Sequence, residues 1–364
     1  MNMKINIKKH KNCKKTFEVK LPAERVKDEF EKVYESIKKV ASIPGYRAGK
    51  VPRDLLEQHY SKTAREEVLK NLVPETYGNI LEEHKLDPIG YPDITDVKLD
   101  LNGEFSYKAS IETKPEFSLK SYKGLKVKRK AKEVKEEDIQ KNLESLREAH
   151  AQNVPKKDSE ASPFVNKGLG EEKEKVLPKL DNEFAKDMGF ESLDKLKEVI
   201  RQNLKAVLEE ASHADLEMQV INQMVDGADF EVPESLVNSE KKRLLKDANM
   251  RIEYMQAMQK QQDPDKKFTL SDKDKKELEE NTSIQAVRQV KAFFILDKIA
   301  RAEKIYIKEE DLEKRIEEMA AQYKKTKKEV RKYMEKNHGL DELALNMRNA
   351  KVIQFLLGEA KISS

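Results

Sequence analysis

The chain has 364 residues, of which 38% are charged and 37% hydrophobic, and it contains no tryptophan. A chain of this length accommodates two or three domains, but so little apolar material excludes one thick globular core and favours elongated helical parts. Its 72 basic and 68 acidic residues leave a formal net charge of +4, so any binding to nucleic acid must come from a local basic patch.

Cysteine and histidine usage indicates no metal, cofactor or catalytic site. Cys13 is the only cysteine, which excludes an intrachain disulfide and a thiolate metal cluster. The histidines share no metal-ligand spacing such as HExxH, and we expect each to be a surface or packing residue. The six are His10, His59, His84, His150, His213 and His338.

The sequence predicts a cytoplasmic protein with no membrane partner. Its N-terminus lacks the apolar segment of a signal peptide, and the longest solid apolar run, Ala292 to Leu296, is far shorter than a membrane span. Together with the single cysteine, this favours a reducing compartment.

Residues 1 to about 112 predict an α+β unit. Alternation at Ile5 and Ile7 and then at 17–21 indicates two strands joined by a basic loop. Helical spacing follows over 22–40, and two further helical pieces are expected over 52–60 and 61–86, the second bent or interrupted at Pro74. Period two returns over 94–101 and 105–111, around a turn at 102–103. A small antiparallel sheet with helices between its strands is therefore expected.

The remaining chain is mostly helical in pattern. Residues 114–130 indicate an extended linker, 135–151 a helix, and the polar, Pro- and Gly-containing stretch 152–179 a loop or disorder. From about Leu180 onward we expect helices with breaks near Gly227, Pro233, Pro264, Ser271 and Lys304. These short capped segments predict an elongated, mostly α-helical domain with packed arms rather than one coiled coil.

One of these helices is expected to begin at a capping box formed by Thr282 and Gln285. The apolar residues that follow are expected on one buried face: Ile284, Val287, Val290 and Phe294.

The stretch SIPGYRAGKVP, residues 42–52, joins the first two predicted helices. Gly45 and Gly49 permit turns with positive φ, and the flanking prolines restrict the chain at both ends, so the loop should have a defined shape. Tyr46, Arg47, Lys50 and Arg53 would then be presented for contacts with structured RNA or an acidic protein surface. Spacing alone leaves open the alternative, a simple helix connection with solvated charges.

Several segments resemble the trigger factor family, a family of bacterial chaperones that dock at the ribosomal exit tunnel. The segment GYRAGKVP, at 45–52, resembles the family signature Gly-Phe-Arg-x-Gly-Lys-x-Pro. Four further segments match in the same order along the chain: YPDI from Tyr91, KPEF from Lys114, VLPKLDNEFAKDMG from Val176 and NMRNAKV from Asn346. They cover both ends of the chain.

The resemblance implies that the loop contacts the large ribosomal subunit, at an exit-tunnel protein and rRNA. The residues carried over are Gly45, Tyr46, Arg47, Ala48, Gly49 and Lys50. Ala48 departs from the lysine that is usual in the family, which weakens the electrostatic part of docking, and Lys50 and Arg53 are expected to supply some of it.

A prolyl isomerase domain that usually accompanies this family is expected to be absent. A domain of that kind needs about 100 residues, whereas the segment 150–175 is far shorter and holds one aromatic residue, Phe164. The predicted organisation is therefore a ribosome-binding α+β domain over 1–112, a linker and helix over 113–149, a short linker over 150–175 and a helical chaperone domain over 176–364. Without a proline pocket, catalysis is not expected.

Methionine and tyrosine residues of the helical half are the expected client-binding surface, because methionine adapts to many apolar sequences. Each could instead belong to the core of an arm. The set comprises Met250, Tyr254, Met255, Met258, Met319, Tyr323, Tyr333 and Met334.

The predicted function is an ATP-independent chaperone that holds nascent or unfolded polypeptides in a helical cradle, partly associated with ribosomes. The family resemblance also implies a weak homodimer away from the ribosome. The alternative is a ribosome- or RNA-binding assembly factor whose helical arms bind proteins but hold no clients.

Overall fold

The computed structural model describes residues 3–47, 49–100, 103–130, 133–150, 152–155, 173–262, 270–337 and 339–363. The chain divides into two compact units, each made of two stretches. Unit 1 combines Met1–Lys120 with Met224–Lys304, and unit 2 combines Ser121–Gln223 with Ile305–Ser364. These compact units do not test the predicted functional division into 1–112, 113–149, 150–175 and 176–364, which stays a prediction.

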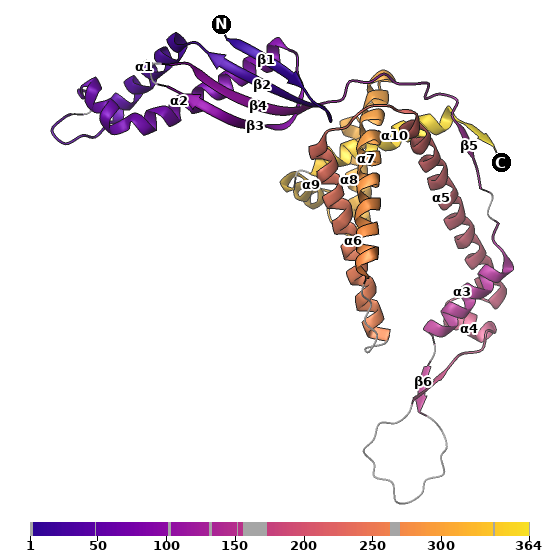
Figure 1. Cartoon of the computed structure of the whole chain (residues 1–364). Helices are drawn as coiled ribbons and strands as arrows, with labels where there is room; N and C mark the ends of the chain where they lie inside the picture. Colours follow the sequence, from indigo (N-terminus) through magenta and orange to yellow (C-terminus); the bar gives the residue numbers. More distant parts are fainter. Residues whose placement is uncertain are drawn as a thin grey trace, which may run out of the picture. The chain divides into compact units, whose positions relative to one another are not determined.

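Unit 1 begins with a four-stranded antiparallel sheet (Figure 1). Its strands are β1 (Lys4–Lys9), β2 (Lys14–Leu21), β3 (Pro88–Leu99) and β4 (Phe105–Thr113), in the order β1-β2-β4-β3. In β4, buried and half-buried residues alternate along the strand, because successive side chains of a strand point to opposite faces. The predicted N-terminal α+β architecture is confirmed.

Strand β3 departs from simple alternation. Its pairing with β4 shifts between Thr95 and Lys98, and Asp96 adopts a positive φ of 53°, as expected where an extra residue bulges out of a ladder. The extra residue leaves Val97 exposed while Leu99 is buried. The sequence prediction placed both in one period-two pattern, which such a bulge interrupts.

Two helices cover one face of this sheet. Helix α1 (Ala23–Val40) and helix α2 (Arg53–Glu83) share a hydrophobic core with β2 and β4. The hydroxyls of Thr76 on α2 and Tyr107 on β4 are 2.7 Å apart and hydrogen-bonded within it. The predicted interruption at Pro74 is wrong, and the two pieces expected over 52–60 and 61–86 belong to one helix, since α2 continues through both. Pro74 and Lys70, whose carbonyl would accept the missing N–H, are both exposed, so water can replace that bond.

Unit 1 is completed by helices α6 (Glu234–Gln262) and α7 (Asp272–Ala302), which run side by side (Figure 1). Phe117 and Phe230 stack with ring centres 4.0 Å apart beside the buried Val232, Val290 and Phe294. This cluster joins the chain after β4 to the bases of both helices.

Helix α7 begins earlier than the predicted capping box. Ser271 caps it, with a reciprocal bond to Asp274. Thr282 instead lies buried within the helix and donates to the carbonyl of Leu278 at 2.6 Å. Ile284 is exposed whereas Val290 and Phe294 are buried, so the predicted common face holds only in part.

Unit 2 contains two short strand pairs. Strands β5 (Lys126–Lys128) and β8 (Lys361–Ser363) pair in parallel, and β6 (Gln152–Pro155) pairs antiparallel with β7 (Lys173–Val176). The sequence prediction assigned these segments to linker, loop and helix. Each strand has three or four residues, too few for a readable period.

The helices of unit 2 form two further hydrophobic clusters. One joins α3 (Glu136–Ala149), α4 (Asn182–Asp187) and the start of α5 (Leu193–Gly227) through Ile139, Leu143, Phe184 and Leu196. The other joins α8 (Glu309–Gln322), α9 (Lys327–Lys336) and α10 (Gly339–Gly358). The predicted helix breaks near Gly227, Pro233, Ser271 and Lys304 are confirmed, and Pro264 lies outside the described residues.

Candidate functional site

The loop between α1 and α2 is fixed at its base. Ala41, Ile43 and Val51 are buried in the core of the sheet and helices. The Tyr60 hydroxyl accepts a hydrogen bond from the Ser42 amide at 3.2 Å. Both ends of the loop are therefore held by apolar burial and by a contact from α2.

Glycine conformation and backbone bonds define the turn itself. Gly45 and Gly49 have φ of 87° and 82°, the left-handed region that other residues adopt only with strain. The Gly49 amide donates to the Lys38 carbonyl at 2.9 Å, and the Lys50 amide donates to the Arg47 carbonyl at 2.9 Å. The predicted positions of both glycines are thus the ones where the turn needs them.

The loop exposes the side chains that the sequence singled out. Tyr46 has 45% of its surface exposed, and Arg47 and Lys50 are also exposed. An aromatic ring and two cations therefore face solvent within one turn. Ala48, the departure from the family signature, lies outside the described residues.

Arg53 has a different place from the one expected. Its guanidinium carbon lies 3.7 Å from the centre of the Tyr34 ring on α1, and its Nε donates to Glu57 at 2.6 Å. Burial raises the pKa of Tyr34, so the cation faces an uncharged ring. Arg53 therefore ties α2 to α1, and its positive charge is engaged within the domain.

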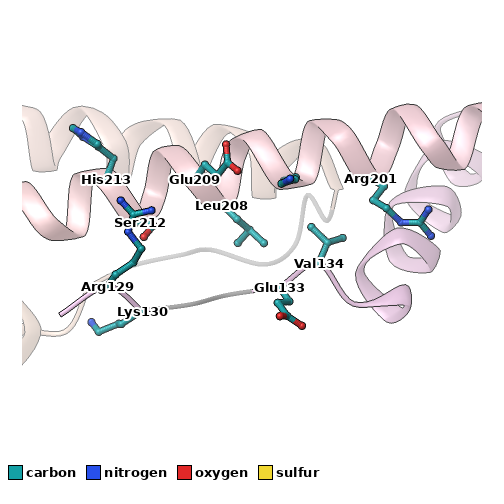
Figure 2. A pocket seen from close by; sticks show the side chains of 10 residues that line it. Arg129, Lys130, Glu133, Val134, Arg201, Leu208, Glu209, Ser212 and His213 are labelled. Atoms are coloured by element: carbon teal, nitrogen blue, oxygen red, sulfur yellow. The ribbon is translucent and has the colours of Figure 1, made fainter. Parts of the chain in front are cut away.

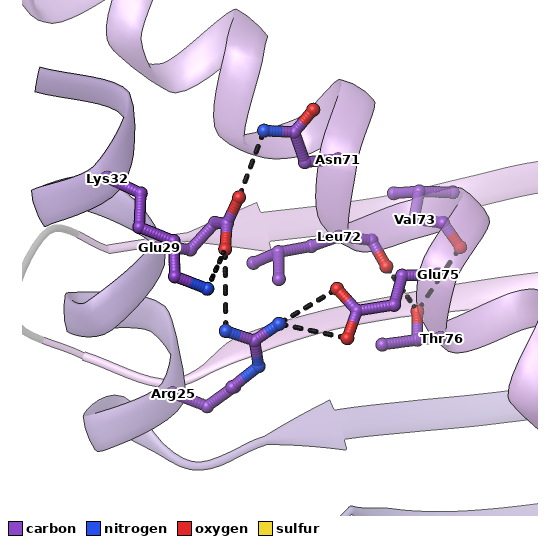
Figure 3. A network of polar contacts seen from close by, with 8 residues as sticks. All are labelled: Arg25, Glu29, Lys32, Asn71, Leu72, Val73, Glu75 and Thr76. Carbon is purple, nitrogen blue, oxygen red and sulfur yellow. Dashed lines mark hydrogen bonds and ion pairs between the residues drawn. The ribbon is translucent and has the colours of Figure 1, made fainter. Parts of the chain in front are cut away.

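A polar network that the sequence prediction missed joins the same two helices (Figure 3). Arg25 on α1 donates to both carboxylate oxygens of Glu75 on α2, at 2.8 and 2.9 Å. Glu29, only 6% exposed, accepts from Asn71 at 2.9 Å and from Arg25 and Lys32 at 3.4 Å. The bond to Glu75 raises the pKa of Arg25. Glu29 lies at a buried position of α1. A charged residue at a helix position where the pattern calls for an apolar one is the signal that could have predicted this network.

The predicted client-binding residues fall into two groups. On α6, four of them, Met250, Tyr254, Met255 and Met258, are exposed, with Tyr254 at 67%. Residues 250, 254 and 258 are four apart, so they form one stripe along the helix. In unit 2, Met319 and Met334 pack against the cluster of α8, α9 and α10, while Tyr323 and Tyr333 are exposed at 61% and 70%.

The described residues do not meet the requirements of a metal site or of a membrane-spanning helix. No group of three or more histidine, cysteine or acidic residues among them could hold a metal ion. No helix in the same residues is long and apolar enough to cross a membrane.

Comparison with known proteins identifies the family. The model described as "Bacterial trigger factor protein (TF)" matches residues 3–146, and the model of the "Bacterial trigger factor protein (TF) C-terminus" matches residues 192–358. The chain belongs to the trigger factor family. Both matches follow the order predicted from the sequence, and they include the loop and both groups of methionine and tyrosine residues.

Relatives match nearly the whole chain. Trigger factor of Geotalea uraniireducens (strain Rf4) is 29% identical over 438 residues, covering 99% of this chain and 98% of the relative. Trigger factor of Geobacter sulfurreducens is 27% identical over 426 residues, covering 97% of each. A solved structure, "Promiscuous Substrate Recognition in Folding and Assembly Activities of the Trigger Factor Chaperone", superposes with a TM-score of 0.55 at 18% identity, over 98% of this chain and 99% of that one. The chain is thus a trigger factor-type chaperone, which confirms the main functional prediction over the assembly-factor alternative.

The segment between the two matched ranges is short for the prolyl isomerase domain that is usual in this family. No model of such a domain matches it, and the two matched ranges leave only 147–191 between them. The match to the Geotalea protein spans 438 residues against the 364 of this chain, so part of that relative has no counterpart here. Within 147–191, strands β6 and β7 pair with each other, and residues 156–172 lie outside the described part.

Replacing Arg25 with alanine should lower the local stability of α1 and α2 by about 1–3 kcal/mol, because Glu75 would lose the guanidinium that donates to both its oxygens and the buried Glu29 would lose one of its two cations. Lys32→Ala is the matched control, since Lys32 also contacts Glu29 but is exposed, and it should cost less than about 0.5 kcal/mol. Native-state hydrogen exchange of amides in both helices measures the two effects. Equal losses in the two variants would show that the network does not hold the helices.

Replacing Gly49 with alanine should destabilise the loop by about 1 kcal/mol, because alanine is strained at its positive φ. Gly78→Ala on α2 provides the contrast, since this glycine is helical with open space around it, and alanine should stabilise the helix by up to about 1 kcal/mol. Hydrogen exchange over residues 41–52 and 70–83 reports each change. A stabilising effect of Gly49→Ala would contradict the described turn.

Proposed function

We propose that this chain docks on the large ribosomal subunit through residues Gly45–Lys50 and holds nascent or unfolded polypeptides beside it. The observation that carries the proposal is the exposed set Tyr46, Arg47 and Lys50 on a loop whose base is buried. Arginine and lysine suit phosphate oxygens of rRNA or carboxylates of a ribosomal protein, and tyrosine adds a stacking surface. A fixed loop binds with little loss of conformational entropy.

Client holding is proposed for the exposed stripe of α6. Methionine side chains are flexible and polarisable, so Met250, Met255 and Met258 can fit unrelated apolar sequences. Many weak contacts that exchange rapidly would release a client without ATP. Tyr254 adds an aromatic contact with a polar end.

The same proposal places the protein in the cytoplasm, partly on ribosomes. Away from the ribosome, a weak homodimer would cover exposed apolar residues such as those of α6, because dispersed apolar surface also favours self-association. Clients and the dimer partner would then compete for the same residues.

The double variant Tyr46→Ala/Arg47→Ala should lower ribosome affinity by about 30-fold or more, since aromatic and arginine anchors at an interface contribute about 2 kcal/mol or more. Cosedimentation of the full chain with ribosomes measures this. Suppression of aggregation by the free protein should remain.

The control for this experiment is Tyr91→Ala/Lys98→Ala, which removes a fully exposed tyrosine and an exposed lysine from β3 of the same domain. It should cosediment like the unaltered chain. Retained binding by the loop variant, or an equal loss in the β3 variant, would count against docking through the loop.

The double variant Tyr254→Ser/Met255→Ser should shorten the delay that the protein imposes on aggregation of an unfolded client, about threefold to tenfold, because the two side chains together contribute on the order of 1 kcal/mol when partly covered. Light scattering of a diluted denatured enzyme measures the delay. Val207→Ser/Met218→Ser on α5 is matched in exposure and should act like the unaltered chain. Equal effects of the two pairs would remove the special role of α6.

A further inference from the structure

Helix α9 and the turn before it form a strongly basic segment of unit 2. The stretch YKKTKKEVRKYMEK, residues 323–336, holds seven basic residues and only two acidic ones, Glu329 and Glu335. This segment is therefore strongly basic although the whole chain is nearly neutral. It is separate from the docking loop and from the α6 stripe.

Two of the seven cations are used inside the unit. Arg331 pairs with Glu309 at 3.2 Å, with Glu335 at 3.0 Å and also with Glu313. Lys327 pairs with Glu313 at 2.8 Å. These contacts engage one of the two acidic residues of the segment and fasten α9 to α8.

The other acidic residue caps the helix. Glu329 accepts bonds from the hydroxyl and the amide of Thr326, at 2.7 and 2.9 Å. Those bonds lower the pKa of Glu329. The charge of Lys325 adds to this lowering of the Glu329 pKa, but in the described part of the chain neither carboxylate forms an ion pair with the remaining lysines.

Five lysines remain, which we call the lysine face: Lys324, Lys325, Lys328, Lys332 and Lys336. All five are exposed, and within the part of the chain that the structure describes none of them forms an ion pair. Lys328, Lys332 and Lys336 are four residues apart, so they lie on one side of α9, about 6 Å from one to the next along its axis.

The backbone holds this face in place. Lys324 adopts a φ of 53°, and its amide donates to Ala321 while the Lys325 amide donates to Ala320 at 2.9 Å. Both bonds close the end of α8 in the pattern that uses a left-handed residue. Val330 and Met334 on the opposite side of α9 pack against the cluster of α8 and α10, so the lysines are directed to solvent.

A face made only for solubility would not need this arrangement. Some other exposed lysines sit beside carboxylates, as Lys70 does with Glu67 and Lys275 with Asp272. Like charges four residues apart destabilise a helix, and Lys328, Lys332 and Lys336 repeat that spacing without relief. A polyanion would relieve it.

Two exposed tyrosines flank the lysine face. Tyr323 ends α8 immediately before Lys324, and Tyr333 follows Lys332. They differ from the α6 stripe because lysines surround them instead of methionines. Unpaired bases stack on such rings while cations neutralise the phosphates.

We propose that the lysine face, with Tyr323 and Tyr333, binds single-stranded RNA. This surface lies in unit 2 and the docking loop lies in unit 1, so the proposal does not depend on docking through that loop. Binding would be electrostatic with base stacking, and it would show no strong preference of sequence.

The test uses the full chain and a fluorescently labelled single-stranded oligouridylate, with anisotropy measured over a range of salt concentrations. The triple variant Lys328→Gln/Lys332→Gln/Lys336→Gln should bind at least about tenfold more weakly at low salt. Its slope of log affinity against log salt should fall by about 2, since each lost phosphate contact on a single strand removes about 0.7. Lys273→Gln/Lys275→Gln/Lys276→Gln is the control, with the same change of charge on exposed lysines that lie among acidic residues.

Tyr333→Ala separates stacking from charge. It should weaken binding about tenfold and leave the salt slope unchanged, whereas Tyr333→Phe should bind like the unaltered chain. Equal losses in the two triple variants would overturn the proposal, as would RNA binding that only Tyr46→Ala/Arg47→Ala abolishes. Tighter binding of polyglutamate than of the oligouridylate would also overturn it, in favour of an acidic protein partner.

Discussion

The packing of α1 and α2 on one face of the sheet determines where the loop between them leaves the domain. Burial of Ala41, Ile43 and Val51 closes the loop at its base, and Arg53 stacked on Tyr34 holds the first turn of α2 against α1. The network around Glu29 fastens the two helices farther along. Because all these contacts lie below the turn, the side chains at its tip remain exposed and available to a partner.

The division of cations in the loop region follows from that constraint. Arg53 donates to Glu57 and stacks on the Tyr34 ring, whereas Arg47 and Lys50 face solvent. Sequence proximity alone would have grouped all three as docking residues. A similar division occurs on α9, where Arg331 fastens the helix to α8 and the neighbouring lysines stay exposed. In both places arginine, with its planar fork of donors, serves the internal contact.

The sequence predicted the fold where periodic patterns are long. The alternation of β2 and β4, the helix over 22–40 and the breaks at Gly227 and Ser271 were all visible in it. The sequence prediction failed where tertiary contacts override local signals. Pro74 lies on the exposed side of α2, and the buried residues on the other side of α2 keep the helix continuous. Strands β5 and β8 form because two segments that are distant in the sequence pair with each other. The sequence did not distinguish the exposed Met250 from the half-buried Met319, since both methionines lie in helices with similar apolar spacing.

Tyr46 is proposed to face the ribosome from a loop that is held at its base. Site-specific photo-crosslinking tests it most directly, with a photoreactive phenylalanine derivative placed at position 46 and, in a second chain, at the fully exposed position 91. If the loop docks on the ribosome, position 46 should crosslink to components of the large subunit and position 91 should not. Equal crosslinking from both positions, or none from position 46 in chains that still cosediment with ribosomes, would contradict it.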